Sequence, residues 1–151
     1  MDVRILDPRI RDWGIPAYQT PGSAAVDLFA CIGAALDIAP QAPAVLISAG
    51  IALSFDDFSC AGLILPRSGQ GHKRGLVLGN STGLIDPDYT GEILISTWNR
   101  NPAGSPPITV QPGERIAQMI FVPVLRPSFT VVEAFSGGTA RAAGGFGSTG
   151  A

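Results

Sequence analysis

Glycine and proline divide this chain of 151 residues into short segments, and this limits its fold more than any other feature. There are 19 Gly and 13 Pro, and both residue types interrupt helices and central strands. We expect strands in the apolar runs between these breaks: Ala24–Phe29, Ala44–Ser54, Cys60–Leu65, Leu76–Leu78, Ile93–Trp98, Ile108–Val110, Ile116–Val124 and Phe129–Val132. Many short strands between turn signals predict an all-β sandwich, jelly roll or barrel.

Helices and domain division follow from the same pattern. No segment has the periodicity of a long amphipathic helix; at most, Ser68–Lys73 forms a turn or two, with Ser68 near its N-cap. The length suits a single domain with its own core. Because glycine is frequent after about Ser136, we expect a β domain over 1–136 and a flexible C-terminal arm over 137–151.

Charged residues are scarce. They make up 15% of the chain, whereas an average soluble domain has about a quarter, and apolar residues reach 46%. One interpretation is that part of the surface is buried against other copies of the chain. The net charge is −2 and there is no basic block, so we expect no binding to a nucleic-acid polymer.

Motifs for membranes, secretion and zinc are missing from the sequence. No apolar run reaches about 18 residues, which argues against a membrane span. Met1–Arg4 lacks the basic start of a signal peptide, so we expect a cytoplasmic protein. Cys31 and Cys60 form no C-x-x-C pair and are expected to be small buried hydrophobes. A single histidine, His72, excludes zinc sites of normal Cys/His spacing, including those of zinc-dependent deaminases.

The segment Leu65–Gly71 carries groups that suit phosphate. A strand is expected to end at Pro66, and the turn after it presents Arg67, the Ser68 hydroxyl and N–H groups flanked by glycine. Such groups at a helix start bind phosphate well. The alternative is an ordinary capped turn, which is the more frequent meaning of such a segment on its own.

Two further segments place polar groups among apolar strands. In Leu78–Glu92, two apolar strands flank a hairpin with two carboxylates, an amide and a tyrosine; by itself, Asp86-Pro87-Asp88 is more often an Asx-type turn than a catalytic pair. In Arg115–Phe121, Arg115 and Gln118 stand on an apolar strand, and the alternative there is a satisfied structural pair at the core edge.

An acid and the chain's last residues complete the candidates. Asp27 stands within an apolar strand, and because a buried, unpaired carboxylate is costly, it needs a hydrogen-bonding partner or a cation-rich site. The segment Gly145–Ala151 carries an aromatic ring, two hydroxyls and glycine N–H groups, with Arg141 upstream. This combination suggests a lid that orders over a nucleotide. Its G-x-G-x-x-G pattern is not a dinucleotide fingerprint, because no βαβ unit surrounds it.

Together these segments resemble the trimeric all-β dUTP pyrophosphatases (dUTPases). The resemblance covers nearly the whole chain in order, through Ala24–Ala30, Pro66–Gly71, Gly79–Glu92, Arg115–Val122 and Gly144–Gly150. It implies a jelly-roll-like, distorted β-barrel (a β-clip fold) that forms a homotrimer. It also implies three active sites at subunit interfaces, each closed by the C-terminal arm of a neighbouring chain.

The resemblance further implies hydrolysis of dUTP to dUMP and pyrophosphate, which keeps uracil out of DNA and supplies dUMP for thymidylate synthesis. Asp86 would activate the water that attacks the α-phosphorus. The resemblance also implies a substrate-binding set. For the base and sugar, Asn80, Gly83 and Ile85 would read uracil, Phe146 would stack on it, and Tyr89 would pack under the deoxyribose. For the phosphates, the residues would be Arg67, Ser68, Gly69 and Gln118, and the arm would bring Arg141, Gly147, Ser148 and Thr149 toward the γ-phosphate. Asp27 would contact waters around a Mg²⁺ that the triphosphate itself binds.

The sequence departs from the family pattern at a few positions. Ala25 and Ala142 stand where the family usually has Gly, and Gln70 replaces a common Leu. Two other functions stay open at this point. One is a dCTP deaminase of related fold, which would need a different catalytic group; the other is a non-catalytic nucleotide sensor.

Overall fold

The computed structural model describes residues 1–138, and this part of the chain is built almost entirely from antiparallel strands. Its elements are β1 (Asp2–Ile5), α1 (Ile10–Trp13), β2 (Val26–Phe29), β3 (Leu36–Ile38), β4 (Val45–Ser54), β5 (Cys60–Pro66), η1 (Gly69–Arg74), β6 (Leu76–Leu78), β7 (Gly83–Ile85), β8 (Glu92–Asn99), β9 (Ile108–Val110) and β10 (Arg115–Pro123). The short segment η1 has π-type helical geometry. The expected all-β fold is confirmed.

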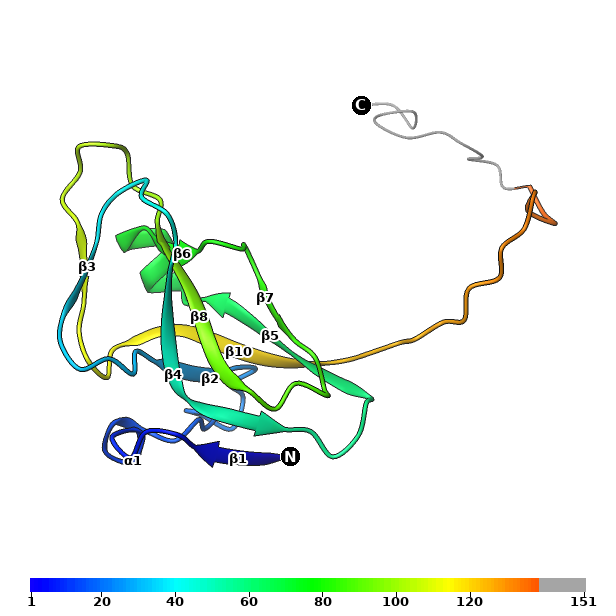
Figure 1. Ribbon diagram of the computed structural model, residues 1–151, viewed down its shortest axis with the longest axis horizontal. Coiled ribbons are helices and arrows are strands. Elements are labelled where there is room, and N and C mark those ends of the chain that lie inside the picture. Colours follow the sequence, from blue (N-terminus) through cyan, green and yellow to red (C-terminus); the bar gives the residue numbers. More distant parts are fainter. Residues whose placement is uncertain (139–151) are drawn as a thin grey trace.

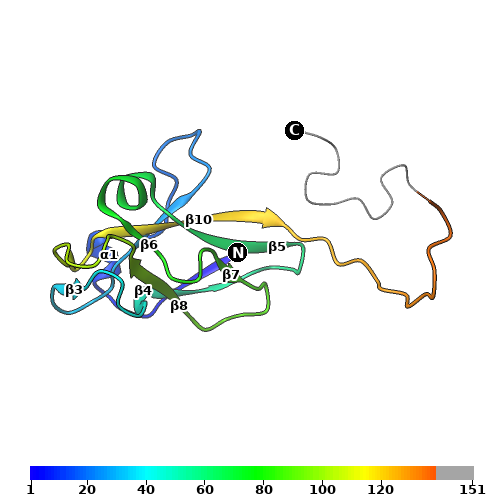
Figure 2. The same cartoon turned by 90° about the horizontal axis from the view of Figure 1, so that it is seen from above.

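The strands form two four-stranded sheets and a small third one. One sheet has the order β1-β4-β8-β6, the other β2-β10-β5-β7, and β3 pairs with β9. Figures 1 and 2 show the sheet of β4 and β8 lying against that of β5 and β10 as two layers. The arrangement is that of a jelly roll, although the two sheets do not close into a continuous barrel.

The core fills the space between the layers. Strand β8 alternates between exposed and buried positions, and Ile93 and Ile95 are 0% exposed. Ile47 and Ile51 of β4 join them from the same sheet, and Met119 of β10 meets them from the other. Each such side chain contributes about 1.5–3 kcal/mol through burial, so the alternating pattern is what holds the two sheets together.

Most of the expected strands are present with small shifts at their ends. Strands β6 and β9 coincide with their expected ranges. Strands β4 and β5 differ by one residue at one end, β8 and β10 by one residue at each end, and β2 begins two residues later than expected. The expectation for Phe129–Val132 is wrong: these residues form no strand and are exposed. Strand propensity alone does not form a strand when no neighbouring strand offers its hydrogen bonds.

Three strands were not expected. Strands β1, β3 and β7 are short and have little apolar signal of their own. The hairpin expected around Leu78–Glu92 is present, because its flanking strands β6 and β8 pair antiparallel. Its long connection also contains β7, which pairs with β5, so the segment between β6 and β7 leaves the sheet of β6 and β8. It crosses from one sheet to the other, through a turn in which Ser81 has φ of 64° and donates its N–H to the Leu78 carbonyl at 3.2 Å.

Beyond β10 the chain leaves the sheets. Val124 still donates its N–H to the Ser59 carbonyl at 2.8 Å, and the following residues run outward without strand structure (Figure 1). The large apolar side chains exposed there are Leu125 (90%), Phe129 (93%), Val131 (99%), Val132 (54%) and Phe135 (91%). The division into 1–136 and 137–151 stays a prediction, because 139–151 lie outside the described residues.

Within residues 1–138, no helix has the length and apolar character needed to span a bilayer.

Candidate active site

Strand β10 brings three of the predicted phosphate-site residues together. It lies between β2 and β5, and Gln118 is in register with Asp27 on one side and Leu65 on the other. Arg67 follows directly after the end of β5. The sheet order therefore places Asp27, Arg67 and Gln118 next to one another, although they come from three separate segments.

Asp27 is the centre of this group. Its Oδ1 lies 2.7 Å from Arg67 Nε and its Oδ2 lies 3.1 Å from Arg115 Nη1. Only 10% of the Asp27 side chain is exposed, against 30% for Arg67 and 47% for Arg115. The expectation that Asp27 needs a partner or cations is confirmed, and the partners are two guanidinium groups. Removing one side of so well-shielded a pair leaves a charge without compensation.

Gln118 and Arg115 do not form the structural pair that the sequence left open. Gln118 instead donates its Nε2 to the Pro66 carbonyl at 3.0 Å, and Arg115 is bound to Asp27. Gln118 thus holds the end of β5, and Arg115 holds β2 through Asp27. The sequence singled out Arg115, but nothing in it indicated that Arg115 would pair with Asp27.

A hollow of about 390 Å³ opens beside these groups. The side chains that line it are Gln19, Ser23, Ala24, Ala25, Asp27, Arg67, Gln118 and Ile120. Ser68 and Gly69 follow Arg67 in the turn after β5 and are exposed. Ser68 was expected to cap the helical turn, but its side chain makes no capping hydrogen bond. Its hydroxyl is therefore available to a ligand, as is the guanidinium face of Arg67 that Asp27 leaves exposed.

A second, smaller hollow of about 160 Å³ lies at the end of β7. Its lining residues are Leu84, Ile85, Asp86, Tyr89, Glu92 and Leu94. The Tyr89 hydroxyl donates to the Glu92 carbonyl at 2.8 Å, which fixes the ring. A Cβ at Gly91 would lie 2.6 Å from the Tyr89 hydroxyl oxygen, so a larger residue at 91 would displace the ring from this position.

Asp86 itself is exposed in this hollow. The N–H of Tyr89 bonds to the Asp86 backbone carbonyl at 3.0 Å, which closes a turn. The Asp86 carboxylate accepts no hydrogen bond from the described part of the chain, so the turn is not held by the Asp86 side chain as an Asx-type turn would be. A free carboxylate beside an apolar wall and an aromatic ring is suited to act on a bound ligand rather than to stabilise the fold.

The two hollows share no lining residue. Gly83 and Ile85 belong to β7 and Asn80 is exposed in the preceding turn, so these residues accompany Asp86 and Tyr89. Within one chain, the predicted site residues therefore form two clusters: one, with Arg67, that suits the binding of phosphate, and one that carries the free carboxylate of Asp86. The predicted arm residues lie outside the described residues: Arg141, Phe146, Gly147, Ser148 and Thr149.

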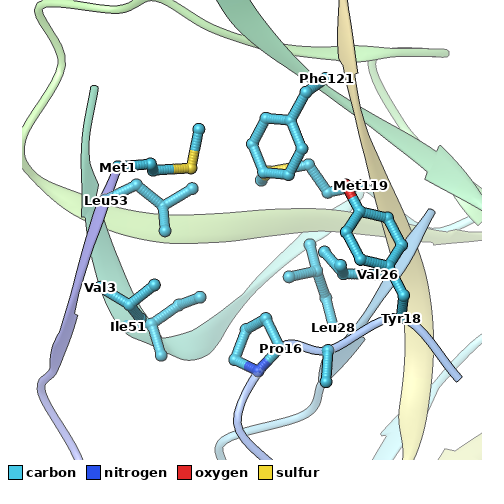
Figure 3. Close-up of a pocket in the computed structure, with 11 residues that line it drawn as sticks. Met1, Val3, Pro16, Tyr18, Val26, Leu28, Ile51, Leu53, Met119 and Phe121 are labelled. Atoms are coloured by element: carbon cyan, nitrogen blue, oxygen red, sulfur yellow. The ribbon is translucent and has the colours of Figure 1, made fainter. Parts of the chain in front are cut away.

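A third cavity, of about 360 Å³, was not predicted. Figure 3 shows Val3, Ile51 and Leu53 on one side of it and Val26, Met119 and Phe121 on the other. It lies between the edge strands β1 and β2 of the two sheets, and its walls are almost wholly apolar. No carboxylate or basic side chain lines it, so it lacks the groups that acid–base chemistry requires.

The described residues do not form a metal site by themselves. The structure from Met1 to Gly138 contains no group of three or more His, Cys, Asp or Glu side chains placed to hold an ion. Asp27 is the single carboxylate that lines the larger hollow, and both of its oxygens face arginines. A divalent cation in this hollow would therefore take its ligands mainly from phosphate oxygens and water, with Asp27 contacting such a water at most.

The fold and the two hollows define an all-β protein that presents cations to an anionic group and a free carboxylate beside an apolar slot. A family model described as dUTPase matches residues 11–150. The chain belongs to the dUTPase family.

Relatives with closely similar sequences carry the name deoxyuridine 5'-triphosphate nucleotidohydrolase. The protein from Serratia proteamaculans (strain 568) is 52% identical over 151 residues, which is 99% of this chain and 96% of the relative. The protein from Escherichia coli (strain K12 / DH10B) is also 52% identical, over 99% of this chain and 97% of the relative.

Solved structures of phage dUTPases share the fold. The dUTPase of Staphylococcus bacteriophage 80alpha, solved with dUPNHPP, gives a TM-score of 0.81 with 26% identity, over 99% of this chain and 98% of that chain. A mutant dUTPase of phage phi11 of S. aureus, solved with a structural Mg(II) ion, gives 0.74 with 23% identity, over 90% of this chain and 98% of that chain.

Proposed function

We infer that this chain is a dUTP diphosphatase, which hydrolyses dUTP to dUMP and pyrophosphate. Membership of the dUTPase family carries the reaction. The observation that carries the assignment of the catalytic group is the exposed Asp86 carboxylate, which stands free at the rim of a slot with Tyr89. The family model and the name deoxyuridine 5'-triphosphate nucleotidohydrolase carried by the relatives favour hydrolysis of dUTP over deamination and over binding without turnover.

Asp86 acts as the general base. Its carboxylate accepts a proton from a water molecule, and the water oxygen forms a bond to the α-phosphorus. The bond from the α-phosphorus to the oxygen that bridges to the β-phosphorus breaks, and pyrophosphate leaves with that oxygen. The protein forms no covalent bond in this step, so positioning and charge neutralisation supply most of the catalysis.

Base and sugar are recognised in the slot beside Asp86. Asn80 and the backbone of the 79–89 connection, with Gly83 and Ile85, read the uracil edge, where thymine's methyl group does not fit. The Tyr89 ring packs under the deoxyribose and leaves no room for a 2′-hydroxyl. The bond from Tyr89 to Glu92 supports this role, because a fixed ring excludes the larger sugar better than a mobile one.

The phosphates bind at the other group of residues. Arg67, Ser68, Gly69 and Gln118 hold them, and Asp27 keeps Arg67 in place from behind. A Mg²⁺ bound by the triphosphate neutralises part of its roughly four negative charges. Asp27 would contact the waters of that ion, through whatever part of its carboxylate the two arginines leave accessible.

We also propose that the active site forms between copies in a homotrimer. The residues expected to bind phosphate and the slot with Asp86 lie in two separate hollows of one chain. This supports a site between subunits, since each chain would complete the site of a neighbour. The apolar cavity of Figure 3 and the five exposed large apolar side chains of the described residues after β10 also favour burial against further copies. A mass in solution of three times 15.6 kDa would support the trimer, and a monomer that turns over dUTP would contradict it.

The C-terminal residues close this site as a lid. Phe146 stacks on uracil, while Arg141, Gly147, Ser148 and Thr149 bind toward the γ-phosphate. Stacking alone is worth about 1–3 kcal/mol, similar to the cost of fixing one or two residues at about 1–2 kcal/mol each. The lid therefore orders only when the γ-phosphate adds its charge contacts, and it opens once pyrophosphate has left.

The deciding assay measures pyrophosphate and ammonia release from dUTP and from dCTP with Mg²⁺. Pyrophosphate from dUTP alone is expected. Ammonia from dCTP would indicate a deaminase, and tight binding of dUTP without turnover would indicate a sensor. We place the enzyme in the cytoplasm, acting on free nucleotides and neither on a membrane nor on a nucleic-acid polymer.

A further inference from the structure

Every polar atom of the Gln70 side chain has a partner. Gln70 stands in η1, just after the turn that holds Arg67 and Ser68. Its Nε2 donates to Glu114 Oε1 at 2.8 Å and to the Arg115 backbone carbonyl at 3.2 Å. Its Oε1 accepts a hydrogen bond from Arg74 at 3.1 Å. An apolar side chain at this position would make none of these bonds.

Arg74 and Glu114 hold Gln70 from the other side. The Arg74 guanidinium bonds to Glu114 Oε1 and to the Thr109 carbonyl. Glu114 Oε2 accepts the N–H of Gln111 at 3.0 Å, which fixes the carboxylate in the turn before β10. The side chains of Arg74 and Glu114 are 33% and 21% exposed. The network is thus partly shielded from solvent, and each of its members is held by more than one bond.

The network ends at the carbonyl that supports Arg67. Arg67 Nη1 lies 3.5 Å from the Arg115 carbonyl oxygen, the same atom that accepts from Gln70. Asp27 binds the Arg67 guanidinium on its other edge and the Arg115 guanidinium as well. Gln70 therefore fixes the backbone that Arg67 rests on, while Asp27 fixes the side chain.

We propose that Gln70, held by Arg74 and Glu114, is a positioning residue of the phosphate turn. It orients the Arg115 carbonyl and the start of η1 so that Arg67 is already aimed at the triphosphate before the ligand binds. Pre-ordered groups bind more tightly because less conformational entropy is lost on binding. This role rests on the proposed function, since it assigns Gln70 to the same phosphate site; Gln70 itself touches no substrate.

The test uses two variants that leave the net charge unchanged, Gln70→Leu and Arg74→Lys. Calorimetry measures Kd for inorganic triphosphate, for dUPNHPP and for deoxyuridine, which has no phosphate. Loss of the support for the Arg115 carbonyl, which is one of the three bonds of Gln70, predicts a rise of about 3- to 10-fold in Kd for both triphosphates. Kd for deoxyuridine stays within about twofold, and KM for dUTP rises by a larger factor than kcat falls.

Gln41→Leu is the matched control. Its side chain also donates to two backbone carbonyls, those of Arg100 at 3.0 Å and Asn101 at 2.9 Å, outside the phosphate turn. This variant keeps the triphosphate Kd even where its thermal stability falls. An unchanged triphosphate Kd in both test variants would overturn the proposal, as would an equal weakening of deoxyuridine or the same loss in Gln41→Leu.

The same measurements distinguish a failure of the proposed function from a failure of the role of Gln70. A wild-type chain that releases no pyrophosphate from dUTP contradicts the proposed function. Binding of inorganic triphosphate then still decides the role of Gln70, because this probe needs neither the uracil slot nor Asp86. A wild-type chain that fails to bind inorganic triphosphate overturns the role of Gln70 as well.

Discussion

Asp27 and Arg67 form a close ion pair in which Oδ1 and Nε lie 2.7 Å apart, with Asp27 almost fully buried. Because Arg115 binds the second oxygen of the same carboxylate, one acid orders two cations at the edge of a hollow. An arginine held in this way keeps part of its guanidinium free for a ligand while its direction is fixed. The pair thus links the stability of the sheet to the binding of phosphate.

Removal of the Asp27 carboxylate leaves two guanidinium groups without their partner. We expect Asp27→Ala to lower the free energy of unfolding by about 2–4 kcal/mol, slightly less than for a fully buried pair, because Arg115 remains partly solvated. Chemical denaturation measures this change. Asp12→Ala, at an exposed carboxylate of α1, serves as control and should stay within about 0.5 kcal/mol; equal losses in the two variants would contradict the role of the pair.

Asp86→Asn tests the general base. The amide keeps the shape of the side chain but cannot accept the proton, so turnover should fall by at least about 10³-fold while the Kd for dUPNHPP stays within about tenfold. Steady-state assays and calorimetry give the two numbers. Asp88→Asn changes the neighbouring exposed carboxylate in the same way and should retain most of the turnover. Affinity lost in step with turnover would instead make Asp86 a binding residue.

Truncation after Thr139 tests the lid. The strands described here all end before this point, so the shortened chain should keep the circular dichroism spectrum and the number of subunits of the full chain. Turnover should fall strongly, because the groups assigned to the γ-phosphate and to stacking on uracil are gone. A truncated chain with unchanged kcat and KM would remove the C-terminal residues from the mechanism.

The backbone angle at position 50 and the close packing around it both require glycine. It is buried with φ of +69°, and a Cβ there would lie 2.7 Å from Cys31 Sγ and 2.7 Å from Ile10 Cγ1. Gly50→Ala should lower the unfolding free energy by about 2–5 kcal/mol through a left-handed backbone and overpacking. Gly22→Ala adds a Cβ where no atom lies within 4 Å, and its stability should be nearly unchanged. Denaturation curves of the two variants that overlap would refute the argument.

Asp7 predicts a pH dependence of stability in acid. Hydrogen bonds from the Arg9 side chain and backbone hold the pKa of the Asp7 carboxyl well below its ordinary value. Because the pKa is lowered in the folded state, the stabilisation is present above the unfolded pKa of about 3.9 and is lost as pH falls toward the folded pKa. Asp7→Asn should lower Tm at pH 7, and the difference from wild type should shrink at pH 3. A difference that stays constant over this range would exclude the linkage.

The sequence predicted the fold class and the chemistry of single segments. Gly and Pro spacing limits strand length locally, and the alternating pattern of β8 marks its buried face, so the strands with strong apolar patterns could be placed within two residues. The phosphate turn and the Asp86 segment were singled out by their residue types, although each alone is more often an ordinary turn. Their roles followed from the order of several such segments along the chain. These properties depend on near neighbours along the chain, and a sequence shows such neighbours directly.

Only the tertiary structure decided which of these groups meet. That Asp27 binds Arg67 and Arg115 depends on β10 lying between β2 and β5, and that the 79–89 connection crosses between sheets depends on the partners of β6 and β7. The same holds for the bond from Gln70 to the Arg115 carbonyl. Strand pairing is set by the packing of the whole core, in which residues distant in sequence compete for the same neighbours, and no local pattern encodes the outcome of that competition.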